Sequence, residues 1–449
     1  MGAGQVGATL ASHLSVDNEV TVVDTDLARL NDLQERLDIR TVCGPASYPN
    51  ILLSAGAEEA DLLIAVTYSD ETNIVACQVA FHLFKIKTKI ARVRAPQYGL
   101  YGALFTRQAL AIDTLISPET LVTQHIKHLI EHPDALQVVN FANGLVQLAG
   151  VRTLYGSPLV GHALGEMKHH MPHIDTKVVA IFRRNKAIIP SPSTIIEPDD
   201  EVFFIATPAN IDAVMRELHP FDTSYRRIII AGGGHIGSKL AQALEHQFHV
   251  KIIDHSLART QTLAGELSKA LVLHGDAADR ELLLDENIQD CDVFCAVTNQ
   301  DEANIMSAIL AKRLGARKVM ALINRPAYVD VIEGGEIDIA ISPEQATIGR
   351  LLAHVRRADV VNVYTLRRGA AEAIEAIAHG DKQSSALIGR KISEVALPPG
   401  TTIGAIVRQS HVLIANETVE IEAEDHIILF VVDKAHIPAV EGLFSPETL

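Results

Sequence analysis

Apolar residues follow two alternating patterns along most of this 449-residue chain. Short runs rich in valine and isoleucine, as at 20–23 and 226–231, alternate with stretches in which leucine recurs at helical spacing, as at 27–37. Such alternation is typical of βαβ units, whose strands form a parallel sheet covered by helices. It predicts two Rossmann-like, doubly wound α/β domains, at residues 1–130 and 225–350.

Two shorter segments with a different pattern follow these large domains. In each of them short strands dominate, and a polar loop leads into an apolar run, at 195–205 and again at 420–430. We predict small α+β domains at 137–219 and 360–446. The chain then has the order A-B-A′-B′, with a linker at 220–225.

A Ser-Pro-Glu triplet follows the last predicted strand of each large domain, at 117–119 and 342–344. Serine is a preferred N-cap, and proline is favoured at the first position of a helix. Each triplet therefore predicts the start of a helix that leads into the following small domain.

A glycine-rich turn occurs at the same place in both large domains. Residues 2–7 read GAGQVG and residues 232–237 read GGGHIG, and an aspartate, Asp24 or Asp254, follows each about 20 residues later. Glycine is needed where the backbone turns tightly, approaches a phosphate and lets the next helix pack on its strand. The two turns predict two dinucleotide-binding folds, each with a phosphate at a helix N-terminus.

The two aspartates favour one class of ligand. A carboxylate at the end of the second strand accepts hydrogen bonds from the adenosine ribose and repels a 2′-phosphate. We therefore expect NAD(H), or an adenine nucleotide such as ATP or ADP, rather than NADP. The alternative for both residues is an ordinary solvated acid at a strand end.

Further candidates lie at the predicted carboxyl edge of each sheet. Thr67 and Thr298, each inside a duplicated AVT-x-x-DE-x-N block, end the fourth strand and can line the crevice. Asp276 follows the third strand of the second copy and could bracket the adenine, whereas the first copy has Pro45 there. Ordinary turn chemistry is the alternative for the threonines.

Two arginines distinguish the first copy from the second. Arg92 and Arg94 end a predicted strand at positions where the second copy has Leu322 and Asn324. Because a guanidinium can donate two hydrogen bonds to one phosphate, we expect the first pocket to prefer ATP over NAD. The alternative is that both arginines form surface salt bridges.

The first copy lacks the strand that precedes the glycine turn in the second copy, since only Met1 stands before Gly2. In this fold that strand is central, between the strand that ends at Asp24 and the one that ends near Thr67. We expect the reading frame to begin several residues too late, so that an upstream extension supplies the strand. The alternative is a degenerate first copy that tolerates the loss.

Composition disfavours several classes of function. A net charge of −16 without a basic stripe repels nucleic acid and anionic lipid, and no apolar run reaches the roughly 18 residues of a membrane span. Four cysteines and no signal peptide favour a reducing cytoplasm. Motifs for nucleotide hydrolysis and serine hydrolysis are absent, and the histidines at 125 and 128 lack companion metal ligands. We therefore expect neither catalytic residues nor a metal site.

These features together resemble the TrkA family of Trk-type potassium uptake regulators, which have tandem regulator-of-potassium-conductance (RCK) units. The resemblance covers essentially the whole chain and departs from the family at the missing first strand. It implies a non-catalytic, nucleotide-sensing subunit that gates a Trk-type potassium-translocating membrane subunit. It also implies a cytoplasmic homo-oligomer, a dimer or tetramer, that lies on the inner face of the plasma (inner) membrane only through that partner.

The resemblance also implies two nucleotide sites that bind NAD(H) or adenine nucleotides. The first is formed by Gly2, Ala3, Gly4, Gln5, Val6, Asp24, Thr67 and Arg92, and the second by Gly232, Gly233, Gly234, His235, Ile236, Asp254 and Thr298.

Two other functions are open on the sequence alone. An NAD-dependent oxidoreductase would need an acid or base against the nicotinamide, normally from a separate substrate domain, and the small domains offer no such group. A free-standing nucleotide sensor would need no membrane partner. Nicotinamide turnover and co-sedimentation with membranes separate these functions from a gating subunit.

Overall fold

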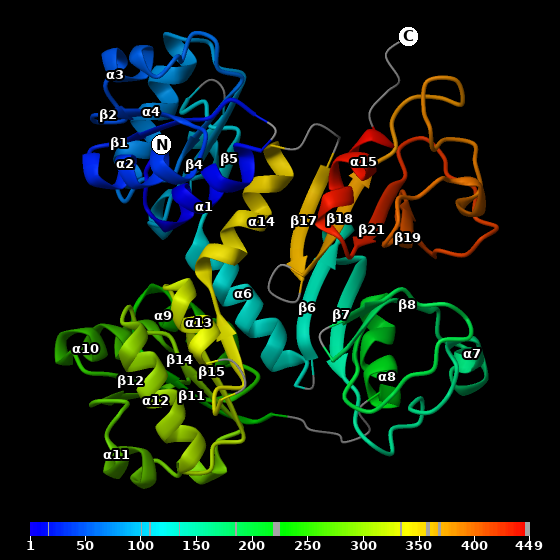
Figure 1. Ribbon diagram of the computed structural model, residues 1–449. Helices are drawn as coiled ribbons and strands as arrows, with labels where there is room; N and C mark the ends of the chain where they lie inside the picture. Colours follow the sequence, from blue (N-terminus) through cyan, green and yellow to red (C-terminus); the bar gives the residue numbers. More distant parts are fainter. Residues whose placement is uncertain are drawn as a thin grey trace. The chain divides into compact units, whose positions relative to one another are not determined.

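The computed structural model describes residues 1–444, apart from residues 17, 100, 107–108, 134, 185, 219–224, 333–334, 356–359 and 367–369 (Figure 1). The chain divides into two compact units. The first comprises Met1–Leu121 with Pro343–Leu351, and the second comprises Val122–Ser342 with Leu352–Leu449. The predicted linker at 220–225 lies outside the described residues except for Tyr225.

The second large domain has a complete parallel sheet with the strand order β13-β12-β11-β14-β15-β16 (Figure 1). This is the predicted doubly wound arrangement, in which the central strand β11 pairs with both β12 and β14. The strands are β11 (Arg227–Ala231), β12 (His249–Asp254), β13 (Leu271–His274), β14 (Val293–Ala296), β15 (Lys318–Leu322) and β16 (Ile339–Ile341). The helices are α9 (His235–Leu244), α10 (Leu257–Glu266), α11 (Arg280–Asp285), α12 (Asp301–Arg313) and α13 (Pro326–Ile332).

The first large domain has the same order of elements, but its strands form two separate parallel sheets, β1-β2 and β3-β4-β5. The strands are β1 (Thr21–Asp24), β2 (Arg40–Cys43), β3 (Leu62–Ala65), β4 (Thr88–Arg92) and β5 (Thr114–Ile116). The helices are α1 (Gln5–Leu14), α2 (Leu27–Arg36), α3 (Pro49–Ser54), α4 (Asp70–His82) and α5 (Pro96–Gly99).

Met1 and Gly2 together join these two sheets, because the Gly2 amide donates a hydrogen bond of 2.8 Å to the Val23 carbonyl on β1 while Met1 contacts the β3 side. The Met1 carbonyl accepts a hydrogen bond of 2.9 Å from the Val66 amide, and the Met1 ammonium group donates one of 2.7 Å to the Ile64 carbonyl. In the second copy the carbonyl of Ala231, the last residue of β11, accepts the same bond from Val297. Met1 therefore occupies the position of Ala231, and burial lowers the pKa of its ammonium group to about 6.

The two small domains each contain a five-stranded antiparallel sheet, with the orders β6-β7-β10-β8-β9 and β17-β18-β21-β19-β20. The first has β6 (Ala135–Phe141), β7 (Val146–Arg152), β8 (Thr176–Arg183), β9 (Lys186–Ile188), β10 (Glu201–Ala206), α7 (Met167–His170) and α8 (Pro208–Leu218). The second has β17 (Val360–Leu366), β18 (Ala371–Ile377), β19 (Thr401–Arg408), β20 (His411–Ile414), β21 (His426–Val431) and α15 (Ile437–Gly442). Both are the predicted α+β domains.

The two small sheets share one apolar core within the second unit. Phe203 of β10 and Phe430 of β21 are both fully buried in it, with their rings 6.0 Å apart. The Tyr364 hydroxyl on β17 donates a hydrogen bond of 2.9 Å to the Asn140 carbonyl on β6. The small domains are therefore packed face to face rather than independent.

The duplicated polar loops have a structural role in these domains. The buried carboxylate of Asp200 accepts two hydrogen bonds of 2.8 Å from the Arg183 guanidinium, and buried Asp425 accepts bonds of 2.9 and 2.8 Å from Arg408. Such bidentate ion pairs fix two groups in one geometry. Each pair ties the loop to the long strand beside it.

The helices α6 (Pro118–Glu131) and α14 (Pro343–Val355) connect the large domains to the small ones. Both begin at the proline of a Ser-Pro-Glu triplet, as predicted. The hydroxyl of Ser117 accepts a hydrogen bond of 3.4 Å from the Thr120 amide, the contact expected of an N-cap. Each helix begins in the first unit and continues into the second.

Candidate nucleotide-binding sites

The structure explains why two positions of each turn are glycine. Gly2 and Gly232 have φ angles of 95° and 107°, in the region that favours glycine. A Cβ at Gly7 or Gly237 would overlap the carbonyl oxygen of the first glycine. These two positions in each turn are required by the fold itself.

The middle glycines, Gly4 and Gly234, differ from the other two. Apart from the glycine and its two chain neighbours, no atom of the described residues lies within 4 Å of the place where a Cβ would stand at either position. Each residue is the N-cap of the next helix, α1 or α9, and neither makes a side-chain cap. The turn therefore leaves open space at a helix N-terminus, where amide groups and the helix dipole favour an anion.

The remaining turn residues contribute mainly backbone. Gln5 and Val6 are the first two residues of α1, and His235 and Ile236 are the first two of α9. Gln5 and His235 are exposed. Their amides belong to the first helical turn, which has no partners within the helix.

Asp24 and Asp254 are bound to their own glycine turns. One oxygen of Asp24 accepts a hydrogen bond of 2.6 Å from the Ala3 amide, and Asp254 accepts one of 2.7 Å from Gly233. The other oxygens accept from the amide two residues further on, at 2.9 and 2.8 Å. Each carboxylate oxygen can accept more than one bond, so contact with a ribose stays a prediction.

The duplicated AVT-x-x-DE-x-N block connects two neighbouring strands at the carboxyl edge of each sheet. The side-chain oxygen of the fully buried Asn73 accepts hydrogen bonds from the Thr67 amide and hydroxyl, at 2.9 and 2.6 Å. Its amide group donates to the carbonyls of Thr67 and Arg92, at 3.2 and 2.9 Å. Asn73 thus joins the end of β3 to the end of β4.

The second copy repeats this arrangement. Asn304 is fully buried and makes the same four bonds, to the amide, hydroxyl and carbonyl of Thr298 and to the Leu322 carbonyl, at 2.9, 2.7, 3.0 and 2.9 Å. The threonines predicted as ligand residues are therefore held by asparagines that we had not assigned a role. The sequence signal for the role of these asparagines was that an asparagine ends the block in both copies.

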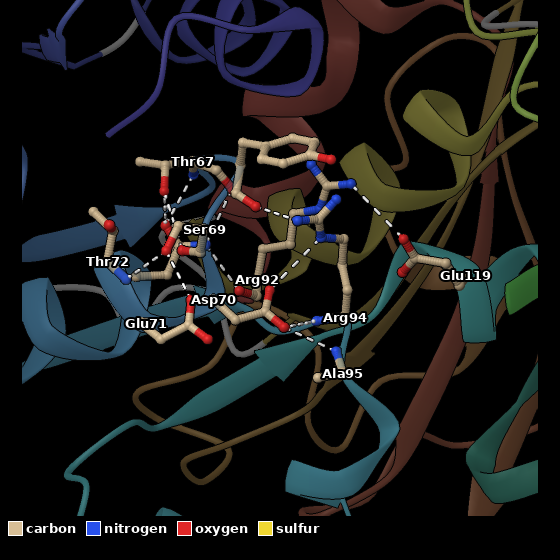
Figure 2. Close-up of polar contacts among 11 residues, drawn as sticks. Thr67, Ser69, Asp70, Glu71, Thr72, Arg92, Arg94, Ala95 and Glu119 are labelled. Atoms are coloured by element: carbon tan, nitrogen blue, oxygen red, sulfur yellow. Dashed lines mark hydrogen bonds and ion pairs between the residues drawn. The ribbon is translucent and has the colours of Figure 1, made fainter.

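The aspartate of the block makes a second tie. Asp70, at the start of α4, accepts hydrogen bonds from the amides of Arg94 and Ala95, at 3.0 and 2.8 Å (Figure 2). Asp301 accepts bonds of 2.9 and 2.8 Å from the corresponding amides of Asn324 and Arg325. These aspartates fix the segments that follow β4 and β15, and sequence reasoning missed them as well.

Arg92 and Arg94 extend from the end of β4 in Figure 2. Arg94 stacks on the Tyr68 ring, 4.2 Å from its centroid, and donates to the Tyr68 carbonyl. Arg92 lies 3.9 Å from the Glu119 carboxylate on α6, and its Nε has no hydrogen-bond partner among the described residues. Burial lowers the pKa of Arg92, while Glu119 acts in the opposite direction. The contact of either arginine with phosphate stays a prediction.

Two side chains modify the second site. Asp276 is exposed and accepts a hydrogen bond of 2.9 Å from the Ala278 amide, so it caps its own turn. Arg259, on α10, donates a bond of 2.6 Å to the Gly233 carbonyl and thereby adds a positive charge beside the glycine turn. Sequence reasoning missed Arg259, because nothing in the local pattern shows that it reaches the turn.

Other reactive groups lie away from these sites. Burial raises the pKa of the Cys77 and Cys291 thiols to about 12, which makes them poor nucleophiles. Within the described residues, no three histidine, cysteine, aspartate or glutamate side chains are arranged to hold a metal ion. In the same part of the chain no helix combines the length and apolar character that crossing a membrane requires.

Comparison with known proteins identifies the repeats. The TrkA-N domain family matches residues 1–118 and 228–343, and the TrkA-C domain family matches residues 148–219 and 382–445. The solved RCK domain of GsuK covers 98% of this chain and 93% of its own, with a TM-score of 0.61 and 19% identity. That likeness supports the fold.

Curated relatives match over nearly the whole chain. The Trk system potassium uptake protein TrkA of Halomonas elongata is 60% identical, and the match covers 99% of this chain and 98% of the relative. The proteins of the same name from Vibrio alginolyticus and Haemophilus influenzae are 55% and 50% identical over the same shares. With its two TrkA-N and two TrkA-C domains, the chain belongs to the TrkA family of Trk-system potassium uptake proteins.

Proposed function

We propose that this chain binds NAD(H) or an adenine nucleotide in each large domain and uses that binding to gate a Trk-type potassium-translocating membrane subunit. The observation that carries the proposal is the open space at Gly4 and Gly234, each at the N-terminus of a helix. A phosphate fits there, because only the middle glycine leaves room for it. The GsuK channel, whose structure bound to NAD has a TM-score of 0.61 to this chain, supports a nucleotide in this fold.

The first site is connected to both linking helices. Thr9 on α1, the helix that follows the glycine turn, donates a hydrogen bond to Glu344 at the start of α14. Arg92, at the crevice, pairs with Glu119 at the start of α6. A ligand that shifts α1 or Arg92 therefore changes contacts of the helices that lead to the small domains. These contacts give nucleotide binding a route to the rest of the molecule.

Gating by a ligand requires different affinities for two states of the assembly. Shifting an equilibrium from about 1:99 to 99:1 takes roughly 5.5 kcal/mol of differential binding, more than one modest site supplies. Each chain has two sites, and a homo-oligomer (a dimer or a tetramer) repeats them. Together these sites supply the required difference in binding free energy. The duplication fits a regulator whose sites act jointly, at the cytoplasmic face of the membrane through its partner.

Replacing the middle glycines tests the nucleotide sites. Gly4→Ala and Gly234→Ala should each leave the thermal unfolding temperature nearly unchanged, because a methyl group meets no atom there, yet weaken NAD or ATP binding about tenfold or more. Gly265→Ala on α10, which also meets no atom within 4 Å among the described residues, is the matched control. Calorimetry that shows equal affinities in all three variants would refute phosphate binding at the turns.

A second experiment tests gating without catalysis. Membranes that contain the potassium-translocating subunit should retain the purified chain, and added nucleotide should change potassium flux without being consumed. Sustained oxidation or reduction of the nicotinamide would instead support an oxidoreductase. Nucleotide binding with no retention by such membranes would support a free-standing sensor.

A further inference from the structure

Three histidines surround the glycine turn of the second large domain. His235 is the first residue of α9, directly after the open position at Gly234. His255 directly follows Asp254, and His274 ends β13, where it is the register partner of Asp254. All three are exposed at the carboxyl end of their strands or at the start of the helix.

Contacts connect two of these imidazoles to Asp254 and to the residue after it. His255 Nδ1 lies 3.8 Å from Asp254 Oδ1, and His274 Nε2 lies 3.1 Å from the His255 carbonyl. The second oxygen of Asp254 accepts the bond from the Gly233 amide. The His255 side chain remains 88% exposed, so it is accessible to a ligand. A positive charge on these rings therefore raises the electrostatic potential where the ribose and phosphates would lie.

The first copy has the same backbone without these groups. Its corresponding residues are Gln5, Thr25 and Cys43, and Cys43 is the register partner of Asp24. The Cys43 thiol even makes the contact that His274 makes, to the Thr25 carbonyl at 3.7 Å. The two sites thus differ in titratable side chains rather than in chain path.

The other charged groups near the second turn include more carboxylates than guanidinium groups. Asp254 and the exposed Asp276 are negative, and Arg259 is positive and lies 3.7 Å from Glu266 on its own helix. At the start of α12 and in the segment after β15, Arg325 pairs with Glu302 at 2.9 Å, and Tyr328 also contacts Glu302. The four carboxylates and two guanidinium groups named here leave a net charge of −2. Histidine is the side chain that ordinarily changes charge between about pH 5 and 8.

We propose that the second nucleotide site is proton-coupled: its three histidines make it bind the anionic nucleotide more tightly as the pH falls. This rests on the proposed nucleotide binding and adds regulation to the same site. Because the bound diphosphate stabilises protonated imidazole, binding takes up protons. By linkage, affinity rises as the pH decreases.

NAD is the probe for the test, because both phosphates of its diphosphate bridge are esterified and do not titrate near neutral pH. Calorimetry on the full-length chain should show the affinity of one site rising about tenfold between pH 8 and pH 5.5. In buffers that differ in ionisation enthalpy, the observed heats should reveal proton uptake. The triple variant His235→Gln, His255→Thr, His274→Ser should bind NAD with no such pH dependence.

Controls separate proton-coupled NAD binding at the second site from a general effect of removing histidines. His169→Gln removes an exposed imidazole from α7 of a small domain and should keep the full pH dependence. The reciprocal variant Gln5→His, Thr25→His, Cys43→His should make NAD affinity at the first site increase more steeply as the pH falls than it does in the wild type. Equal pH dependence in the wild type and the triple histidine variant would overturn the inference while leaving nucleotide binding intact. No NAD binding at any pH in either protein would overturn the proposed function as well.

Discussion

At the scale of single residues, the repeated blocks carry two kinds of information. Gly7 and Gly237 are required because a side chain would overlap the turn, whereas Gly4 and Gly234 leave space that the fold itself does not use. Asn73 and Asn304 make identical sets of four bonds in the two copies. Repetition of a residue therefore marks structural requirement as readily as ligand contact.

The asparagine of the block should be a stability determinant. Asn304→Ala removes four hydrogen bonds and leaves the Thr298 amide and the Leu322 carbonyl without this partner in a buried region. We expect the free energy of unfolding of this domain to fall by about 2 to 4 kcal/mol, measured by urea denaturation of the full chain. Asn299→Ala, at an exposed position of the same turn, is the control. Equal losses in the two variants would contradict the role of Asn304.

At the scale of elements, the linking helices join regions distant in sequence. Helix α14 brings Glu344 to Thr9 of α1, and helix α6 brings Glu119 to Arg92. Their starting points were predictable, because Ser-Pro-Glu is a local signal. The partners of the two glutamates were not, because they depend on where other segments of the chain pack.

Helix α6 also contains a partly buried histidine that makes stability depend on pH. Burial, with a smaller contribution from His128, lowers the pKa of His125 to about 4, below the ordinary histidine value of about 6.5. The unfolded state then binds more protons between these values, so the free energy of unfolding decreases as the pH falls from about 6.5 to about 4. The decrease amounts to at most about 3 kcal/mol.

Denaturation at several pH values measures this effect. His125→Leu should unfold with a weaker pH dependence than the wild type across this window, while exposed His173→Gln should behave like the wild type. An unchanged pH dependence in His125→Leu would show that other groups titrate on unfolding.

At the scale of the whole molecule, the two halves have the same domains but unequal nucleotide sites. Arg92, which has a buried Nε without a hydrogen-bond partner among the described residues, is replaced by Leu322 in the second half. The histidines around the second turn are replaced by uncharged residues in the first. Duplication has preserved the scaffold while the charges at its ligand edge diverged.

The arginine should set the ligand preference of the first site. Arg92→Leu is expected to weaken ATP binding there about tenfold, to change NAD binding less and to reduce the dependence of ATP affinity on salt. Arg36→Leu, which removes an exposed arginine from α2, is the control for net charge. If both variants bind ATP equally well at low and high salt, then Arg92 serves only as the partner of Glu119.

The sequence by itself determined the features that depend on neighbouring residues. The glycine turns, the helix starts at Pro118 and Pro343 and the alternation of strands and helices follow from local backbone preferences, and the internal repeat gave the order of domains. The central place of the strand before the glycine turn also followed, and β11 confirms it.

Only the tertiary structure decided which distant groups meet. It showed that Asp24 holds Ala3 and that Asn73 holds the end of β4, and it paired Glu344 with Thr9. It also packed the two small sheets on one core through Phe203 and Phe430. The physical reason is that such contacts form only after long chain segments close, so their partners are set by global packing and not by local pattern.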